Sequence, residues 1–337
     1  MNISPLVRFA GSFGGYQLSR LITAKHPRIL MYHRFSRNVE PGHLDAAMFE
    51  WQVQHIAKNY IPVTVSELAE DLYVKQRRPR NRIAITIDDG YEDFYEIAWP
   101  ILKKYSVPAT FYVTTGFVSG DIWLWPDQLR FLLEHSPDSV GRHDFNIARI
   151  ETPIPNEKFE SEYWRLNQLM LQADNADKIL CLNEMAAAWD IDLPDIPPKE
   201  YRAVSWEQLQ EMQSEGLEVG GHTVSHPSLA RVSMEEAKSE IFGCAEILRQ
   251  KLGESPRSFC YPNGTVDDFV GGQVSFIKDA GFSCAAVAFA DCQGHAQRYA
   301  MRRHTGSQDR FQFLKSISGV ELLGMRLRHH LVETCYD

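Results

Sequence analysis

Two histidines in one short stretch have the type and the spacing for metal chemistry. The stretch "GGHTVSHPSL" places His222 and His226 four positions apart, behind a pair of glycines that would let the chain turn sharply. A structural zinc site needs four ligands, and a catalytic one needs three and an open position. The pair alone is therefore an incomplete ligand set, for which solvent exposure or a local cap is the simpler explanation.

A second stretch, "ITIDDGY", can supply the missing ligand, because Asp88 and Asp89 follow a buried apolar run. Adjacent acids in such a place cost free energy unless they are paired or used, although Asp-Gly is also a common turn. Consecutive side chains at a strand end diverge, so one carboxylate can bind a metal while the other takes a proton from water. Two histidines and one carboxylate suit Zn²⁺, with Fe²⁺, Co²⁺ and Ni²⁺ as alternatives.

Both motifs directly follow predicted strands. The run "RIAITI" at 82–87 leads into Asp88, and "LEVGG" at 217–221 leads into His222. In barrels and open α/β sheets, active sites lie at the carboxyl ends of the strands. We therefore expect the aspartates and the histidines on one rim of the same sheet.

An alternation of short apolar runs with helical stretches begins at residue 28 and predicts βαβ units in a parallel sheet or barrel. Pro100 should divide the helix expected at about 92–104, and two capping boxes, Ser205 with Gln208 and Ser233 with Glu236, predict further helix starts. The predicted strands cover residues 28–32, 82–87, 109–115, 217–222, 258–262 and 284–290.

Residues 117–200 interrupt this alternation with helix formers and no evident series of strands. They predict a helical insertion between barrel units rather than an independent domain. The chain then divides into an N-terminal segment at 1–27, a barrel at 28–305 that contains the insertion, and a C-terminal helical segment at 306–337.

Composition narrows the class of protein and its compartment. The net charge of −9 argues against a nucleic-acid partner, since phosphate backbones select basic faces. No window is apolar over enough length to span a bilayer, and the N-terminus does not resemble a secretory signal. The six cysteines form no CxxC pair, so we expect reduced thiols and a cytoplasmic protein. An amphipathic stretch at 6–22 could contact a membrane surface, although packing on the domain is the simpler expectation.

Three motifs in this order, "ITIDDGY", "GGHTVSHPSL" and "SFCYPNG", resemble those of the polysaccharide deacetylases of carbohydrate esterase family 4, which share the nodulation-protein-B-like (NodB) homology domain. The resemblance covers about residues 28–116 and 202–305, most of the chain outside the insertion. It implies an α/β fold, an incomplete (β/α)7 barrel of the glycoside hydrolase/deacetylase type. The alternation of strands and helices agrees with this fold.

The resemblance also implies a role for each matching residue. Asp88 would be the general base, and Asp89, His222 and His226 would hold a divalent metal, with Zn²⁺ first among the candidates. A backbone amide in the third motif, that of Tyr261, would help to hold the oxyanion.

The sequence departs from the family pattern in its third motif. Many members carry an arginine there that pairs with the catalytic base, and this chain has Cys260 instead. Arg302 or Arg303, at the end of a late strand, could supply the same charge from another rim position. We assign the role to Arg303.

The late histidine motif that supplies the general acid is not clear in this chain either. His33 ends the strand at 28–32 as Asp88 ends the strand at 82–87, so its side chain should point onto the same rim. We predict His33 as the general acid, with His295 and His304 as alternatives.

The sequence therefore predicts a metal-dependent hydrolase that removes N-acetyl groups from the amino sugars of a glycan or glycan precursor, in surface polysaccharide or lipopolysaccharide biosynthesis. Alternatives are a catalytically silent carbohydrate-binding barrel, an O-acetyl esterase, or a cyclic amidase with the same metal site. The expected location is the bacterial cytoplasm, with peripheral contact to the inner membrane as an alternative. Trp123 and Trp125 could stack on sugar rings, although packing is the commoner role of such aromatics.

Overall fold

A curled sheet of parallel strands lies at the centre of the structure, a computed structural model that describes residues 14–194, 196–290, 295 and 297–328. Its strands are β1 (Arg28–Tyr32), β4 (Ile61–Val63), β5 (Arg82–Ile87), β6 (Thr110–Val113), β9 (Glu218–Gly221), β10 (Ser258–Cys260), β11 (Cys284–Ala286) and β12 (His304–Thr305). Their order is β11-β10-β9-β6-β5-β1-β12, and β4 also pairs with β5. Every pairing is parallel, as the βαβ pattern predicts.

The sheet curls into an incomplete barrel. One short segment, residues 301–305, lies between strands β11 and β1 and connects them, and we call this segment the seam. On one side of the seam, Met301 bridges Ala286. On the other side, His304 pairs with Leu30 of β1. The predicted α/β incomplete barrel is thus confirmed.

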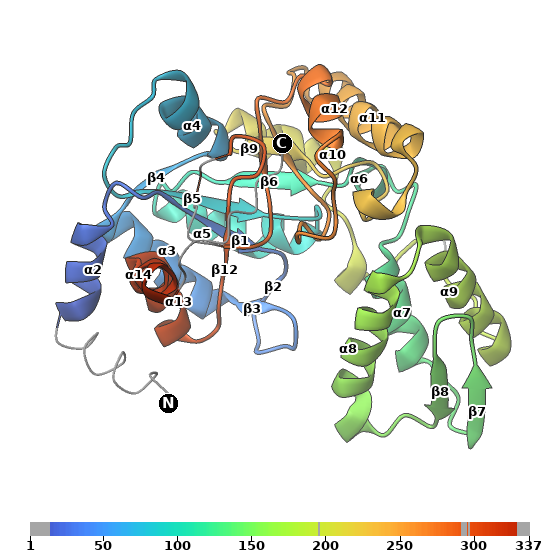
Figure 1. Cartoon of the computed structure of the whole chain (residues 1–337). Coiled ribbons are helices and arrows are strands. Elements are labelled where there is room, and N and C mark those ends of the chain that lie inside the picture. Colours follow the sequence, from blue (N-terminus) through green and yellow to red (C-terminus); the bar gives the residue numbers. More distant parts are fainter. Residues whose placement is uncertain (1–13, 195, 291–294, 296, 329–337) are drawn as a thin grey trace.

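Helices cover the outside of this sheet (Figure 1). They are α3 (Ala46–Asn59), α4 (Val65–Ala69), α5 (Trp99–Lys104), α6 (Thr115–Val118), α10 (Trp206–Ser214), α11 (Met234–Leu252) and α12 (Gln273–Asp279). Pro100 lies in the first turn of α5, after a π-helical turn at Phe94–Ala98, so the predicted helix is divided there. Ser205 and Gln208 form the predicted capping box of α10. Ser233 caps α11.

The alternation along β5 separates the interior of the barrel from the core outside it. Ile83, Ile85 and Ile87 are fully buried and belong to the main hydrophobic core, together with residues of α3, α5 and α10. Successive strand residues face opposite sides of a sheet, so Thr86 lies on the inner face. Asp88 continues that inner row at the point where β5 ends, which directs a carboxylate into the rim.

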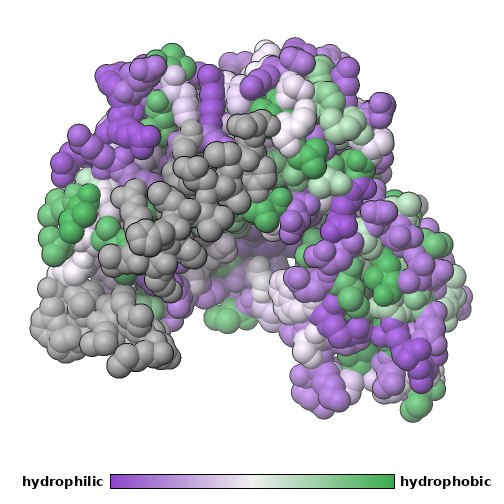
Figure 2. Space-filling view, viewed as in Figure 1, coloured by the Kyte–Doolittle hydropathy of each residue, from purple (hydrophilic) through white to green (hydrophobic). Residues whose placement is uncertain are grey.

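The insertion forms a lobe beside the barrel (Figure 1), and the surface is hollowed between the two (Figure 2). Its elements are α7 (Trp125–Glu134), β7 (Gly141–Asp144), β8 (Arg149–Thr152), α8 (Asn156–Gln172) and α9 (Asn175–Trp189). They enclose a hydrophobic core of their own. The prediction of an insertion without strands is wrong, because β7 and β8 pair as an antiparallel hairpin. Each strand has only four residues, too few for the alternation of apolar and polar residues to stand out in the sequence.

The two ends of the described chain pack side by side, as α2 (Tyr16–Ile22), α13 (Arg310–Ser318) and α14 (Val320–Arg328) (Figure 1). Buried Arg28 donates from Nε to the carbonyl oxygen of Ile317 at 2.7 Å. Gly319, between α13 and α14, has φ +87°, and a Cβ there would overlap Thr23. The smaller β2 (Phe35–Ser36) and β3 (Leu44–Asp45) pair with each other after β1.

The described part of the predicted amphipathic stretch presents apolar side chains to solvent. Leu18, Leu21 and Ile22 on α2 are 56% to 64% exposed. The remainder of that stretch lies outside the described residues. None of the helices in the described ranges combines the length and the apolar character that crossing a bilayer requires.

Four cysteines lie in the described part of the chain, namely Cys181, Cys244, Cys260 and Cys284, and all four are free and buried. Burial raises the pKa of the Cys244 and Cys284 thiols to about 12. Such thiols behave as small core residues rather than as nucleophiles. Cys292 and Cys335 lie outside the described residues.

Candidate active site

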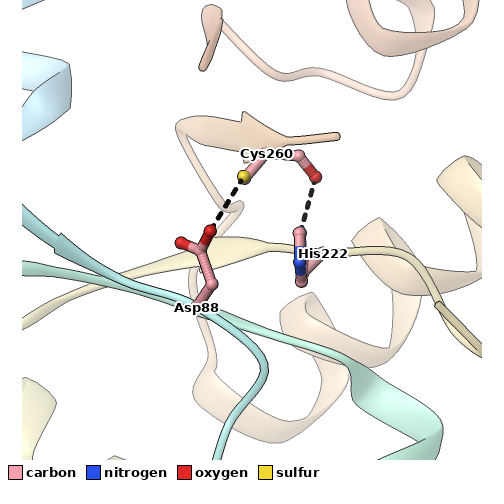
Figure 3. A group of neighbouring side chains, drawn as sticks. All are labelled: Asp88, His222 and Cys260. Carbon is pink, nitrogen blue, oxygen red and sulfur yellow. Dashed lines mark hydrogen bonds between the residues drawn. The ribbon is translucent and has the colours of Figure 1, made fainter. Parts of the chain in front are cut away.

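The two predicted motifs meet on one rim of the barrel. Asp88 and Asp89 follow β5, His222 follows β9, and β6 lies between these two strands in the sheet. Figure 3 shows Asp88, His222 and Cys260, at the ends of three different strands, turned toward one another. The rule that parallel strands carry sites at their carboxyl ends therefore holds for this chain.

Asp89, His222 and His226 form a group in which one ligand atom of each lies within 4.8 Å of the others. The Oδ1 atom of Asp89 is 3.5 Å from Nε2 of His222 and 3.4 Å from Nε2 of His226. These separations exceed the usual length of a hydrogen bond. They match the edge of a tetrahedron around a zinc ion with bonds of about 2.0–2.1 Å, which is about 3.3–3.4 Å.

The hydrogen bonds and charges around this group suit a cation. His222 Nδ1 lies 2.8 Å from the carbonyl oxygen of Cys260. A carbonyl only accepts, so Nδ1 carries a proton and Nε2 is the atom that faces Asp89, as in histidines that bind a metal through Nε2. The Arg303 guanidinium pairs with the Asp88 carboxylate, whereas the Asp89 carboxylate faces only the two histidines. One carboxylate and two imidazoles are thus turned toward one another, and the residues present fit a divalent metal.

The backbone that carries these ligands is held in an unusual conformation. Asp89, Thr223 and His226 have φ values of +80°, +66° and +60°, a region that residues other than glycine seldom adopt. Such strain persists only where surrounding contacts impose it, and it is typical of functional sites.

Glu240 of α11 supplies contacts that impose this conformation on the histidine loop. Its carboxylate accepts hydrogen bonds from the amides of Val224 and Ser225, both at 2.8 Å, and from the Ser225 hydroxyl at 2.6 Å. Sequence reasoning missed Glu240, because the α11 position that faces the loop is visible only in the folded chain.

The glycine pair before His222 has a different role from the predicted sharp turn. Gly220 and Gly221 belong to the extended strand β9. A Cβ on Gly220 would lie 2.5 Å from the Tyr112 ring, and one on Gly221 would lie 2.7 Å from the Phe282 ring. Close packing of side chains against β9, rather than turning, is therefore what requires glycine at both positions.

Asp88 is a buried carboxylate that Arg303 holds by both oxygens. Arg303 Nη1 lies 2.7 Å from Oδ1, and Nη2 lies 2.7 Å from Oδ2. Burial alone would raise the pKa of Asp88, but the Arg303 guanidinium holds it below its usual value. Asp88 is therefore ionised at neutral pH, as a general base requires.

The structure distinguishes between the two candidate arginines of the seam. Arg302 donates from Nη1 to the carbonyl oxygen of Ala300 at 2.5 Å, and its guanidinium lies 4.7 Å from the centre of the Phe289 ring. Only Arg303 reaches Asp88, and its Nη2 also lies 3.0 Å from Sγ of Cys260. The small thiol leaves the space that this guanidinium occupies.

The three candidate histidines for the general acid lie in different places. His33 has a side chain that is 44% exposed, with Nε2 3.8 Å from Oδ2 of Asp88. His295 is buried, with Nε2 3.1 Å from the carbonyl oxygen of Pro27, at the amino end of β1. His304 faces Glu321 of α14, with Nδ1 3.3 Å from Oε2. Of the three, His33 is the one brought to the rim.

The Tyr261 amide is not free as its predicted role requires. Its N–H donates to the carbonyl oxygen of Ala286 on β11 at 3.3 Å, and its side chain is fully buried. The Tyr261 N–H is therefore already hydrogen-bonded within the sheet, to β11. The assignment of this amide to the oxyanion stays a prediction that the geometry does not support.

A cavity of about 490 Å³ opens from this group, with His33 and Asp89 in its lining. Sequence reasoning missed two acids beside it. Burial raises the pKa of Asp127 to about 7 and that of Asp93 to about 6. No motif signals Asp127, because its approach to the site depends on how the insertion packs.

The two insertion tryptophans pack internally. Trp123 lies with its ring centre 5.4 Å from that of Phe131 and 5.7 Å from that of Tyr201. Trp125 packs against the core of the lobe. Neither lines the cavity.

Comparisons with known proteins agree with the fold. The family model described as polysaccharide deacetylase matches residues 75–284. A relative from Bacillus subtilis (strain 168), "Putative polysaccharide deacetylase YxkH", is 29% identical over 136 residues, which are 40% of this chain and 48% of that protein. The poly-beta-1,6-N-acetyl-D-glucosamine N-deacetylase of Staphylococcus aureus (strain MSSA476) is 34% identical over 88 residues, 26% of this chain and 30% of that protein. The chain thus spans less than half the length of these relatives.

Solved structures show the same fold at lower sequence identity. The Streptococcus pyogenes deacetylase PplD, in complex with acetate, aligns with a TM-score of 0.57 at 17% identity, covering 88% of this chain and 99% of that one. IcaB from Ammonifex degensii aligns with a TM-score of 0.57 at 18% identity, covering 87% and 97%.

Proposed function

Because this chain belongs to the polysaccharide deacetylase family, we propose that it is a metal-dependent hydrolase that removes acetyl groups from N-acetylated amino sugars of a glycan or glycan precursor. The observation that carries the proposal is the juxtaposition of a three-residue ligand set with a charged, arginine-paired carboxylate. Asp89, His222 and His226 form the first, and Asp88 with Arg303 forms the second. A pure binding protein needs no base beside such a site.

Asp89, His222 and His226 would hold the divalent metal, which we propose to be Zn²⁺. When bound, such a metal polarises an amide carbonyl and lowers the pKa of water toward neutrality. Asp88 accepts the proton of the attacking water. Each of its oxygens has two lone pairs, and Arg303 takes only one on each oxygen, so an acceptor position remains.

We assign the second proton transfer to His33. Its Nε2 is 3.8 Å from Oδ2 of Asp88, and its ring borders the cavity that a substrate would enter. From that position it can deliver a proton to the leaving amine, and acetate and a free amino sugar result. Arg303 stays charged throughout and fixes the orientation of the base.

The test is release of acetate from N-acetylglucosamine oligomers by the purified, Zn²⁺-loaded protein. Asp88→Asn should lower the rate by about 10²–10⁴-fold, as expected for loss of a general base, and should retain the metal. Asp279→Asn, at the exposed end of α12, is the matched control and should keep full activity. A protein that binds no metal and releases no acetate from any such oligomer would overturn the proposal. Faster release from O-acetylated than from N-acetylated sugars would reassign it to esters.

We also propose that the substrate is a precursor of a bacterial surface polysaccharide or lipopolysaccharide, handled in the cytoplasm with peripheral contact to the inner membrane. Free, buried cysteines in the described part of the chain support a reducing compartment. The exposed apolar side chains of α2 support contact with a membrane surface. Fractionation of the native host, with detection in the soluble, membrane and external fractions, tests this location.

A further inference from the structure

The cavity at the active site continues from the barrel onto the insertion. Its lining includes His33 and Asp89 of the barrel and also residues from two helices of the lobe. The residues that the insertion contributes include Asp127, Arg130 and Glu134 from α7 and Tyr163, Trp164 and Asn167 from α8. At about 490 Å³ the cavity has the size of a small-molecule binding site, and the lobe forms one of its walls.

Trp164 is an exposed aromatic residue in this wall. It is 49% exposed and lies in the lining of the cavity, so part of its ring is open to a bound molecule. The neighbouring Tyr163 packs edge-on against it, with ring centres 5.3 Å apart. Tyr163 is in turn covered by the guanidinium of Arg130, at 4.2 Å from its ring centre. The Tyr163 ring therefore packs against the indole and helps to fix its position, while part of the indole stays exposed, as stacking on a sugar ring requires.

Polar contacts fix this wall relative to the barrel. Tyr91, which follows the aspartate pair, donates to Asp127 of α7 at 2.7 Å. Arg34 of the barrel lies 3.8 Å from the same carboxylate. Tyr201 donates to Glu134 at 3.1 Å. These contacts hold both ends of α7 in place beside the cavity.

The lining of the cavity is acidic. Its two arginines lie nearest to carboxylates outside the lining, Arg34 to Asp93 at 2.6 Å and Arg130 to Glu160 at 2.9 Å, and farther from Asp127 at 3.8 Å and Glu134 at 4.0 Å within it. Asp89 is assigned to the metal and Asp127 faces Arg34, so the negative charge of the lining comes mainly from Glu40, Glu134 and Glu200. Like charges brought together cost free energy, so this surface disfavours uronic acids and other anionic sugars.

We propose that the insertion is the distal wall of the catalytic cleft and binds the sugar unit next to the one that loses its acetyl group, with Trp164 stacked on that unit. Because a second sugar unit is bound, the substrate is an oligomer or polymer rather than a single sugar. Because the lining is acidic, this second unit is neutral or carries a free amine. This inference rests on the proposed deacetylase function.

The experiment compares Trp164→Ala with Leu169→Ala, a residue of the same helix that is 39% exposed and does not line the cavity. Acetate release is measured with N-acetylglucosamine and with its β-1,6-linked tetramer. Trp164→Ala should lower kcat/KM at least tenfold more for the tetramer than for the single sugar, mainly through KM. Leu169→Ala should leave both values unchanged. Equal losses on the two substrates, or no loss on the tetramer, would overturn the proposal.

Binding separates this inference from the proposed reaction. Isothermal titration calorimetry measures the affinity of the tetramer for Zn²⁺-loaded Asp88→Asn protein, with and without Trp164→Ala. A tenfold weaker affinity in the double variant supports the wall even if no acetate is released from any substrate. Equal affinities, or no binding to either protein, contradict it. A hyaluronan tetrasaccharide, which carries uronic acids, should bind at least tenfold more weakly than the neutral tetramer, and equal binding would refute the charge argument.

Discussion

Replacing Arg303 by methionine tests whether the seam of the barrel keeps Asp88, the proposed general base, in its ionised form. Asp88 and Arg303 are 2% and 1% exposed, and two guanidinium nitrogens lie 2.7 Å from the two carboxylate oxygens. Methionine fills much of the same space without a charge, so the carboxylate would stay buried with no partner. Removing one side of such a pair costs about 3–5 kcal/mol.

Arg303→Met should therefore lower the free energy of unfolding by about 3–5 kcal/mol, measured by chemical denaturation in a fixed excess of Zn²⁺. The double variant with Asp88→Asn should be less destabilised than Arg303→Met alone, because no uncompensated charge remains. Arg302→Met is the matched control, since Arg302 is equally buried and contacts Ala300 rather than Asp88. Its stability should not depend on the residue at position 88.

A rescue experiment extends the same test to activity. Cys260 lies with Sγ 3.6 Å from the Asp88 carboxylate, at the position where many family members carry arginine. Cys260→Arg added to Arg303→Met should recover at least tenfold in kcat. The reasoning is refuted if Arg303→Met and Arg302→Met lose equal stability, if Asp88→Asn offsets neither, and if the added arginine restores nothing.

Three further changes test other parts of the structure. Glu240→Ala removes the acceptor of the Val224 and Ser225 amides and should weaken Zn²⁺ affinity about 10–100-fold, as measured by chelator competition. Glu246→Ala is the control and should keep the original affinity; the same affinity in the Glu240→Ala and Glu246→Ala proteins would contradict the prediction. Gly221→Ala places a Cβ 2.7 Å from the Phe282 ring and should cost about 1–3 kcal/mol in thermal unfolding; an unchanged Tm would remove the packing argument. Burial lowers the pKa of His295 to about 3, so below pH 6.5 the unfolded state binds a proton that the folded state does not. As the pH is lowered from 6.5 to 3, this one group should decrease the free energy of unfolding by about 1.4 kcal/mol per pH unit. His295→Gln should make the dependence on pH less steep, and parallel plots of unfolding free energy against pH for the two proteins would count against the prediction.

The ligand set was predictable from the sequence because it depends on local rules. A buried strand that leads into two aspartates, and another that leads into two histidines, must place these residues at carboxyl ends in a parallel sheet. The aspartate pair therefore meets His222 and His226 without any knowledge of side-chain packing, whereas the choice of Asp89 over Asp88 as the ligand came from the resemblance to the family. The same rule places His33 beside Asp88.

The rest depends on contacts between distant segments, which leave little trace in the local pattern. Arg302 and Arg303 are adjacent, and only the register of the seam decides which one enters the barrel. Trp164 lies in the insertion, away from the three motifs, and its approach to the site follows from the packing of α7 and α8. The glycines of β9 were assigned to a turn because the crowding by Tyr112 comes from another strand.

The seam has a consequence for the way the proposed active site is assembled during folding. Residues 301–305 follow all the strands that carry the ligands and the base, and they join both ends of the sheet. Arg303 reaches Asp88 only once this late segment has been inserted. A chain that has folded its first seven parallel strands and lacks the last would still hold a base without its counter-charge. Competence for the proposed hydrolysis should therefore appear together with closure of the barrel at the seam, and not before it.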